Sequence, residues 1–276
     1  IEARDRIGGR AFSSHSSSGI VVELGAEFIH GAHRETLDLL DRAGEPFLDL
    51  CDHHLFYDKG RRREIPDFWE RIDRCNGLLN PKLKTDRSIA DFIEARGGRW
   101  SPDLKKLYIS YVEGFQAADI RKAGEKGLAR AERGDEPELN SQAQFRPLHG
   151  YGAVMEFLKK EASLTEESLH LGSVLKEVRG DQRQIELLVQ NAKSPEKRTY
   201  RAKKVVLTLP LSVLKTSVVF QPEISELVEA LAPMEMGHVQ RLTFQFADRF
   251  WEKLDDKPIG FLHTGPGDDF PTWWTQ

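Results

Sequence analysis

The stretch EARDRIGGR, residues 2–10, decides the predicted fold of this chain. Ile1 and Glu2 are typical of the end of a strand, and Gly8 and Gly9 indicate a turn. In a dinucleotide-binding βαβ unit, an acidic residue at the end of the second strand binds the ribose hydroxyls. Glu2 is suited to that role, although a single glutamate is more often a solvated surface carboxylate. The residues around Glu2 therefore carry the prediction.

Taken together, residues 2–10 resemble a signature of the flavin-containing amine oxidases, the family of the monoamine and polyamine oxidases. Protoporphyrinogen oxidases and carotenoid desaturases share this signature. The resemblance implies FAD as cofactor. The absence of a Cβ at the two glycines would let the backbone approach FAD, and an arginine would supply a cation near the flavin and its phosphates. The implied cofactor-binding residues here are Glu2, Ala3, Arg4, Gly8, Gly9 and Arg10.

A second stretch, ELGAEFIHG at residues 23–31, resembles the amine oxidase segment that passes the flavin ring. Polyamine and spermine oxidases carry a similar string with the same Ile-His-Gly ending. The resemblance implies that Gly25, Ala26, Glu27 and Phe28 line the flavin and that His30 faces the substrate as a catalytic residue. The alternative for His30 is a hydrogen-bonded side chain that caps the following helix.

Further matches extend the resemblance along the chain. Residues 113–119 resemble a helical part of the substrate domain, with a role in packing. Residues 150–152 resemble the re-entry into the FAD domain, and residues 208–214 the exit from it. Val174 falls on the strand whose backbone holds the adenine in the family.

These matches predict an α/β fold, in which a Rossmann-like FAD-binding domain is interleaved with an α+β substrate-binding domain. The expected FAD-binding parts are residues 1–52 and 143–213, and the expected substrate-binding parts are 53–142 and 214–276. Local patterns predict a helix over 34–43 that ends at Gly44, a hairpin over 54–65, and helices opened by Ser88 and Ser101. Strands are predicted over 171–178, 185–190, 199–209 and 238–246, with 205–209 central in a sheet.

Arg241 is the chemical departure from the family pattern. Amine oxidases usually carry a lysine that holds a water against the flavin N5, ten residues before the tryptophan of a Phe-Trp pair. Here that tryptophan is Trp251 and the residue is Arg241. Arginine keeps the charge, but its planar fork would place a water differently. Arg241 is therefore a second candidate catalytic residue. The alternatives are a surface-facing strand residue or a shifted register.

Composition narrows the class of protein. A net charge of −4 over 276 residues does not favour nucleic-acid binding. No apolar run reaches the ~20 residues of a membrane span, and no signal peptide is recognised. Cys51 and Cys75 fit no zinc motif, so we expect two reduced thiols, no metal and a cytoplasmic protein. Oligomeric state is left open. Because the chain starts without Met and inside a motif, we expect it to lack both ends of its parent.

The predicted function is FAD-dependent oxidation of a small-molecule amine to an imine, with hydride transfer to the flavin. One alternative is a flavoenzyme related to desaturases or protoporphyrinogen oxidases, against which the Ile-His-Gly ending argues. The other is a non-catalytic or incomplete relative that retains the fold and uses residues such as 61–63 for binding.

Overall fold

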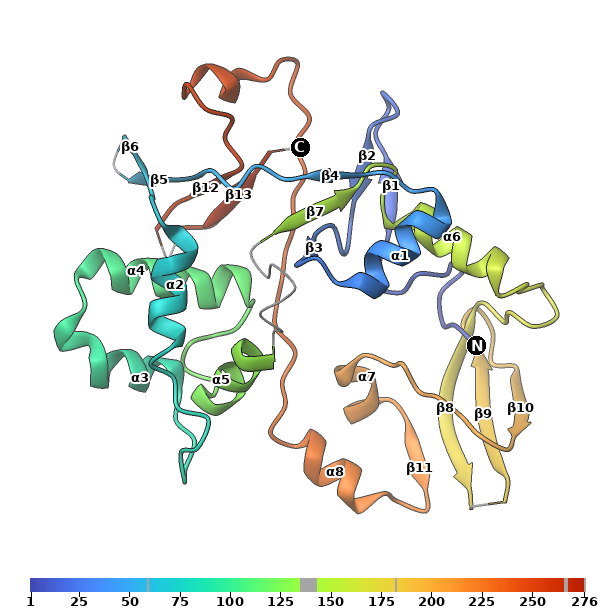
Figure 1. Cartoon of the computed structure of the whole chain (residues 1–276). Helices are drawn as coiled ribbons and strands as arrows, with labels where there is room; N and C mark the ends of the chain where they lie inside the picture. Colours follow the sequence, from blue (N-terminus) through green and yellow to red (C-terminus); the bar gives the residue numbers. More distant parts are fainter. Residues whose placement is uncertain (59, 135–142, 182, 266–267, 276) are drawn as a thin grey trace. The chain divides into compact units, whose positions relative to one another are not determined.

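The computed structural model describes residues 1–58, 60–134, 143–181, 183–265 and 268–275 (Figure 1). They divide into two compact units, each made of two chain segments. Unit 1 comprises Ile1–Glu27 and His149–Met236, and unit 2 comprises Phe28–Leu148 and Gly237–Gln276. The first boundary lies at 27/28 rather than the expected 52/53. The reason is that two strands from residues 28–52 pair with a strand near residue 145 in unit 2.

Unit 1 is built on a four-stranded sheet with the order β10-β9-β8-β11. Neighbouring strands are antiparallel except β11, which runs parallel to β8. A short antiparallel ribbon, β1 with β2, precedes them in the chain. The elements are β1 (Ser13–His15), β2 (Val21–Glu23), α6 (Tyr151–Glu161), β8 (Ser173–Gly180), β9 (Ile185–Asn191), β10 (Lys197–Ala202), α7 (Leu211–Thr216), β11 (Val219–Gln221) and α8 (Ser225–Leu231).

Unit 2 contains two small sheets. The first has the order β3-β7-β4, and the second has the order β13-β12-β5-β6. Gly44 ends α1 with a φ of 63°, as predicted for a left-handed cap. The predicted hairpin is confirmed as β5 and β6, although Lys59 of its turn lies outside the described residues. The elements are β3 (Ile29–His30), α1 (Arg34–Ala43), β4 (Phe47–Asp49), β5 (His54–Asp58), β6 (Arg61–Glu64), β7 (Gln144–Pro147), the 3-10 turn η4 (Phe250–Lys253), β12 (Phe261–His263) and β13 (Thr272–Trp274).

The main apolar core lies among the helices of unit 2, where Phe92 and Tyr108 are fully buried. Both predicted helix starts are confirmed. Ser101 Oγ accepts a hydrogen bond from the Leu104 amide at 3.2 Å, and Ser88 Oγ accepts one from the Asp91 amide at 3.1 Å. The elements are α2 (Phe68–Asn76), α3 (Ile89–Arg96), the 3-10 turn η1 (Gly97–Arg99), α4 (Pro102–Ser110), the π turn η2 (Tyr111–Phe115) and α5 (Glu125–Gly134).

Three strand predictions need correction. Residues 1–10 contain no strand, although the backbone of Glu2 bonds to His170 and Ser173. Residues 205–209 and 238–246 are also not strands; Val206 is 87% exposed and Val239 is 72% exposed. A strand needs a ladder of backbone hydrogen bonds with a neighbour, and residues 205–209 and 238–246 belong to none of the sheets formed by the described residues. The strands over 171–178 and 185–190 are confirmed as β8 and β9.

No helix in the described ranges is both long enough and apolar enough to cross a bilayer. The same residues contain no group of three or more histidine, cysteine, aspartate or glutamate side chains arranged to hold a metal ion.

Candidate functional site

The first group of predicted site residues lies where the chain start meets β8 in unit 1. The Glu2 amide donates to the His170 carbonyl at 2.9 Å, and the Glu2 carbonyl accepts from the Ser173 amide at 2.8 Å. Glu2 therefore lies beside Val174, the next residue in β8. The Arg4 amide donates to Glu2 Oε1 at 2.9 Å, while Ala3 and Arg4 are exposed. The structure thus brings together Glu2, Ala3, Arg4 and Val174, four of the residues predicted to bind FAD.

The Gly8–Arg10 turn forms the second group. Gly8 has a φ of +92°, and a Cβ there would lie 2.5 Å from the Ala11 carbonyl oxygen. The turn itself therefore requires this glycine. Gly9 also has a positive φ, but a Cβ there would meet nothing within 4 Å, so its outer side is open. The Arg6 guanidinium fixes the turn from within, since it donates to the carbonyls of Gly9 and Ile7 at 2.9 and 3.0 Å.

The two sequence motifs pack directly on each other. The Ala26 amide donates to the Arg10 carbonyl at 3.0 Å, and the Leu24 amide donates to the Phe12 carbonyl at 2.8 Å. A Cβ on Gly25 would lie 1.9 Å from the Arg10 carbonyl oxygen, so only glycine fits at this contact. Glu27, the last residue of the segment in unit 1, is buried.

These residues fit a dinucleotide by the chemistry of their donors and acceptors. Glu2 has a second carboxylate oxygen beyond the one that holds the Arg4 amide, which suits a hydroxyl donor. The Arg10 guanidinium is exposed and pairs with no acid among the described residues, which suits a phosphate. Gly9, which precedes Arg10 in the chain, leaves its outer side open for a ligand to approach the backbone.

The third group is an aromatic cluster in unit 2, formed around His30 and Phe28. The His30 ring lies 5.9 Å from the Phe28 ring and 5.2 Å from the Phe115 ring, centroid to centroid. Phe28 also packs against Trp274 at 5.7 Å and Phe261 at 6.1 Å. His30 is exposed as a residue, and partial desolvation of its ring by the neighbouring aromatic side chains lowers its pKa. A neutral imidazole beside apolar rings can accept a proton or a hydrogen bond from an amine.

Arg241 joins this cluster through Trp274. Its guanidinium carbon lies 4.9 Å from the centre of the Trp274 ring, a cation–π distance. Arg241 is half-buried, which differs from the alternative of a surface-facing strand residue. The structure therefore brings Phe28, His30 and Arg241 into one cluster within unit 2. Trp273, by contrast, is exposed and packs against Phe244 and Phe270.

Sequence reasoning missed the role of several residues in this cluster. Phe115 was expected only in packing, and Phe261 was not singled out. Gln144 lies directly opposite His30 in the β3–β7 pair and was also missed. Their positions are far apart in the chain, and no local spacing signals that they meet. No local signal in the sequence indicates a structural role for the buried Glu23, whose carboxylate accepts a hydrogen bond from the Tyr151 amide at 2.6 Å at the start of α6.

Comparison with known proteins gives a family match along almost the whole chain. The model of the flavin containing amine oxidoreductases matches residues 1–106 and 82–275. Rice polyamine oxidase 3 is 26% identical over 92% of this chain and 55% of its own length. Human lysine-specific histone demethylase 2 is 25% identical over 96% of this chain and 34% of its own length.

A solved structure, cyclohexylamine oxidase from Brevibacterium oxydans, is similar with a TM-score of 0.68 and 15% identity. The similarity covers 84% of this chain and 56% of that protein, and it bears on the fold alone. The chain spans about half the length of rice polyamine oxidase 3. Because the family model matches most of its residues, this chain belongs to the flavin containing amine oxidoreductase family.

Proposed function

We propose that the protein is an FAD-dependent oxidoreductase that oxidises an amine. The observation that carries the proposal is that residues 1–31 run without a break from the two packed motifs into the aromatic cluster around His30. The two packed motifs end at Glu27, and the next residues, Phe28 and His30, enter the aromatic cluster. In this proposal unit 1 is a Rossmann-like FAD-binding domain and unit 2 supplies the substrate side. The comparisons support the flavin and the class of substrate.

The proposed cofactor contacts follow the groups described above. Glu2, with Ala3, Arg4 and Val174 beside it, would hold the adenosine end. Gly8, Gly9 and Arg10 would hold the phosphates, and Gly25, Ala26, Glu27 and Phe28 would lie along the ring system. When bound, FAD accepts a hydride equivalent from the C–H bond next to the amine nitrogen.

The chain's own residues would prepare the amine for that step. A protonated amine cannot share its lone pair with the adjacent carbon, so the amine must be neutral when the C–H bond breaks. The neutral His30 imidazole would accept the ammonium proton at a ring nitrogen. Phe28, Phe115 and Trp274 would pack against the alkyl part of the amine. Arg241 would place its cation beside Trp274 at the edge of the cluster.

The test is an anaerobic titration of the full-length protein, followed by its flavin absorption. We expect a yellow protein whose absorption near the flavin bands bleaches on addition of an amine. A yellow protein that no amine bleaches would favour the desaturase-like alternative. A colourless protein that takes up no added FAD would overturn the proposal and leave a non-catalytic relative.

A further inference from the structure

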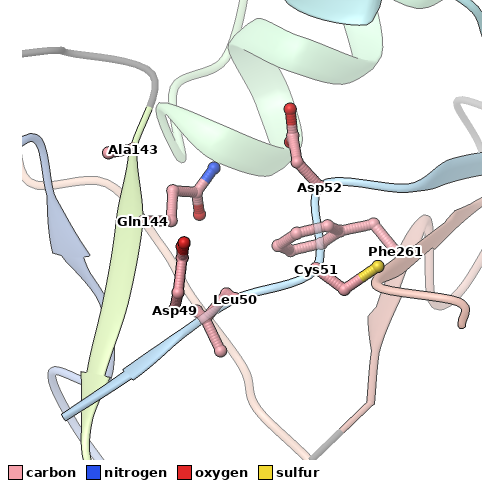
Figure 2. Close-up of a pocket in the computed structure, with 7 residues that line it drawn as sticks. All are labelled: Asp49, Leu50, Cys51, Asp52, Ala143, Gln144 and Phe261. Atoms are coloured by element: carbon pink, nitrogen blue, oxygen red, sulfur yellow. The ribbon is translucent and has the colours of Figure 1, made fainter.

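A cavity in unit 2 and a sheet edge in unit 1 differ in their relation to the candidate site. The cavity, of about 290 Å³, lies where the β4–β5 connection faces β7 (Figure 2). Gln144 in its lining pairs with His30 across β3 and β7, so the cavity belongs to the site described above. The sheet edge is the outer side of β10, and it belongs to no site described above.

The segment that contains β10 is strongly basic. Six of the twelve residues 193–204 are lysine or arginine and one is acidic, whereas the whole chain has a net charge of −4. The Arg198 guanidinium lies 3.0 Å from the Glu196 carboxylate. The Arg201 guanidinium lies 2.8 Å from the Glu186 carboxylate. Four further lysines are exposed and form no ion pair with the described residues: Lys193, Lys197, Lys203 and Lys204.

The backbone of β10 has hydrogen-bonding groups on its outer side. β10 is the end strand of the four-stranded sheet, with β9 on its inner side (Figure 1). Opposed residues of an antiparallel pair are alternately hydrogen-bonded and non-bonded, and the Asn191 amide donates to the Glu196 carbonyl at 2.9 Å. From residue 197 onward, every second residue therefore directs its amide and carbonyl away from β9. Lys197, Thr199 and Arg201 present these groups without a backbone partner among the described residues.

The side chains of these three residues also lie on the solvent-facing side of the sheet. Residues alternate between the two faces of a strand. Leu187 and Val189 of β9, which are buried, oppose Tyr200 and Arg198 and so define the inner face. Lys197, Thr199 and Arg201 therefore share the outer face, and all three are exposed. A strand added beside β10 would place every second side chain next to them.

The charge of this edge decides which strand it accepts. A free strand edge binds extended peptides through its backbone groups. Lysines on such an edge prevent pairing with a second copy, because like charges directly opposite each other destabilise the pair. A carboxylate opposite a lysine stabilises the pair instead. The edge therefore excludes its own copy and favours an acidic strand.

We infer that the outer edge of β10 binds an extended acidic segment of a partner protein, which adds to the sheet as a further strand. Acidic residues at every second position of that segment lie beside Lys197 and Arg201. Their backbone groups bond to those of Lys197, Thr199 and Arg201. The inference uses none of the predicted cofactor or substrate residues, so it stands or falls separately from the proposed function.

The test measures binding of a fluorescent, end-capped peptide of alternating glutamate and valine to the full-length protein by fluorescence anisotropy. Thr199→Pro removes an outward amide and keeps the bonds to β9, so it should weaken binding by about tenfold or more. Lys197→Glu with Lys203→Glu should weaken it by about tenfold or more, because like charges then meet. Lys82→Glu with Lys84→Glu, an equal charge change at exposed sites in unit 2, should leave binding unchanged.

Modified peptides test the strand geometry on the wild-type protein, which keeps the result independent of how Thr199→Pro folds. The glutamates oppose the residues with outward backbone groups, so N-methylation of the glutamates should abolish binding. N-methylation of the valines keeps the same charge and should leave binding unchanged. Circular dichroism checks that each protein variant is folded.

Four results would overturn the inference. They are no saturable binding of the acidic peptide, unchanged binding when the glutamates are N-methylated, displacement of the peptide by oligothymidylate of the same charge, and self-association of the protein that Thr199→Pro abolishes. The third result would assign the basic segment to nucleic acid, and the fourth would assign the edge to a second copy of the chain.

Discussion

The helical part of unit 2 and the sheet of unit 1 bury their apolar side chains very differently. In unit 2, twelve buried residues from the helices and their connections form one cluster, with Phe92 and Tyr108 fully enclosed. In the described part of unit 1, the buried apolar side chains are Val154, Leu187 and Val189, while Val206 and Val219 are largely exposed. In unit 2 the aromatic cluster around His30 therefore packs, through Phe115, against a closed core. In unit 1 the motif residues near the chain start lie on loops held by backbone hydrogen bonds.

The largest expected effect comes from opening the core of unit 2. Phe92→Ala removes a fully buried ring and should lower the free energy of unfolding by ~3–5 kcal/mol. Urea denaturation followed by circular dichroism measures the change. Val206→Ala in unit 1 is the matched control, and we expect it to change stability by less than about 0.5 kcal/mol. Equal losses for both variants would remove the contrast between the units.

The buried His263 should make the free energy of unfolding depend on pH. The pKa of His263 is about 3 in the folded protein, below the ~6.5 of an unfolded histidine. The unfolded chain therefore binds the proton first as pH falls. The contribution of His263 to stability is complete above pH ~6.5 and is lost as pH falls towards 3, by about 3 kcal/mol at pH 4 and by at most about 5 kcal/mol in full.

Denaturation curves at several pH values between 7 and 4 check this prediction. His263→Gln should flatten the pH dependence, and the control His15→Gln, at an exposed site in unit 1, should not. A pH dependence that survives His263→Gln would assign the effect to other groups.

A smaller loss of stability is expected when Glu23, the buried acid at the start of α6 in unit 1, is replaced. Glu23 accepts from Ser13 Oγ at 2.8 Å and from the Tyr151 amide at 2.6 Å at the start of α6. Glu23→Ala removes both bonds and a negative charge from a helix N-terminus, so it should cost ~2 kcal/mol. Glu156→Ala, on an exposed face of the same helix, is the control in denaturation experiments. A cost below about 0.5 kcal/mol for Glu23→Ala would show that backbone bonds alone hold this part of unit 1.

The smallest stability effect is expected at Arg241. Arg241→Lys keeps the cation but loses the planar stack on Trp274, so stability should fall by less than ~1 kcal/mol. If Arg241 lies near the flavin, the rate at which oxygen reoxidises the reduced flavin should nevertheless change. Stopped-flow absorption measures that rate. An unchanged rate would separate Arg241 from the reacting centre and leave it a packing residue of unit 2.

Local features of the fold were predictable from the sequence because neighbouring residues decide them. Gly44 ends a helix through its own left-handed backbone, and Ser101 caps one three residues away. Residues 205–209 and 238–246 were predicted wrongly because an apolar or alternating pattern does not say whether a partner strand is present. The candidate site also contains residues that local motifs identify and residues that only the folded structure brings together. The motifs identified Gly25 and His30, whereas Gln144 and Phe261 join them through pairing that no local spacing reveals.

The most direct test of the central claim is the rate of anaerobic flavin reduction in the full-length protein. Stopped-flow absorption would compare ordinary 1,4-diaminobutane with the same diamine deuterated at the carbons next to nitrogen. If His30 and its cluster prepare an amine for loss of a hydride from that carbon, the flavin is reduced by both, more slowly by the deuterated diamine, and His30→Phe slows reduction by ~10²-fold or more. Two results would contradict the account: a flavin that stays oxidised with this diamine and with every other amine, or a flavin in the His30→Phe variant that the amine reduces at the wild-type rate.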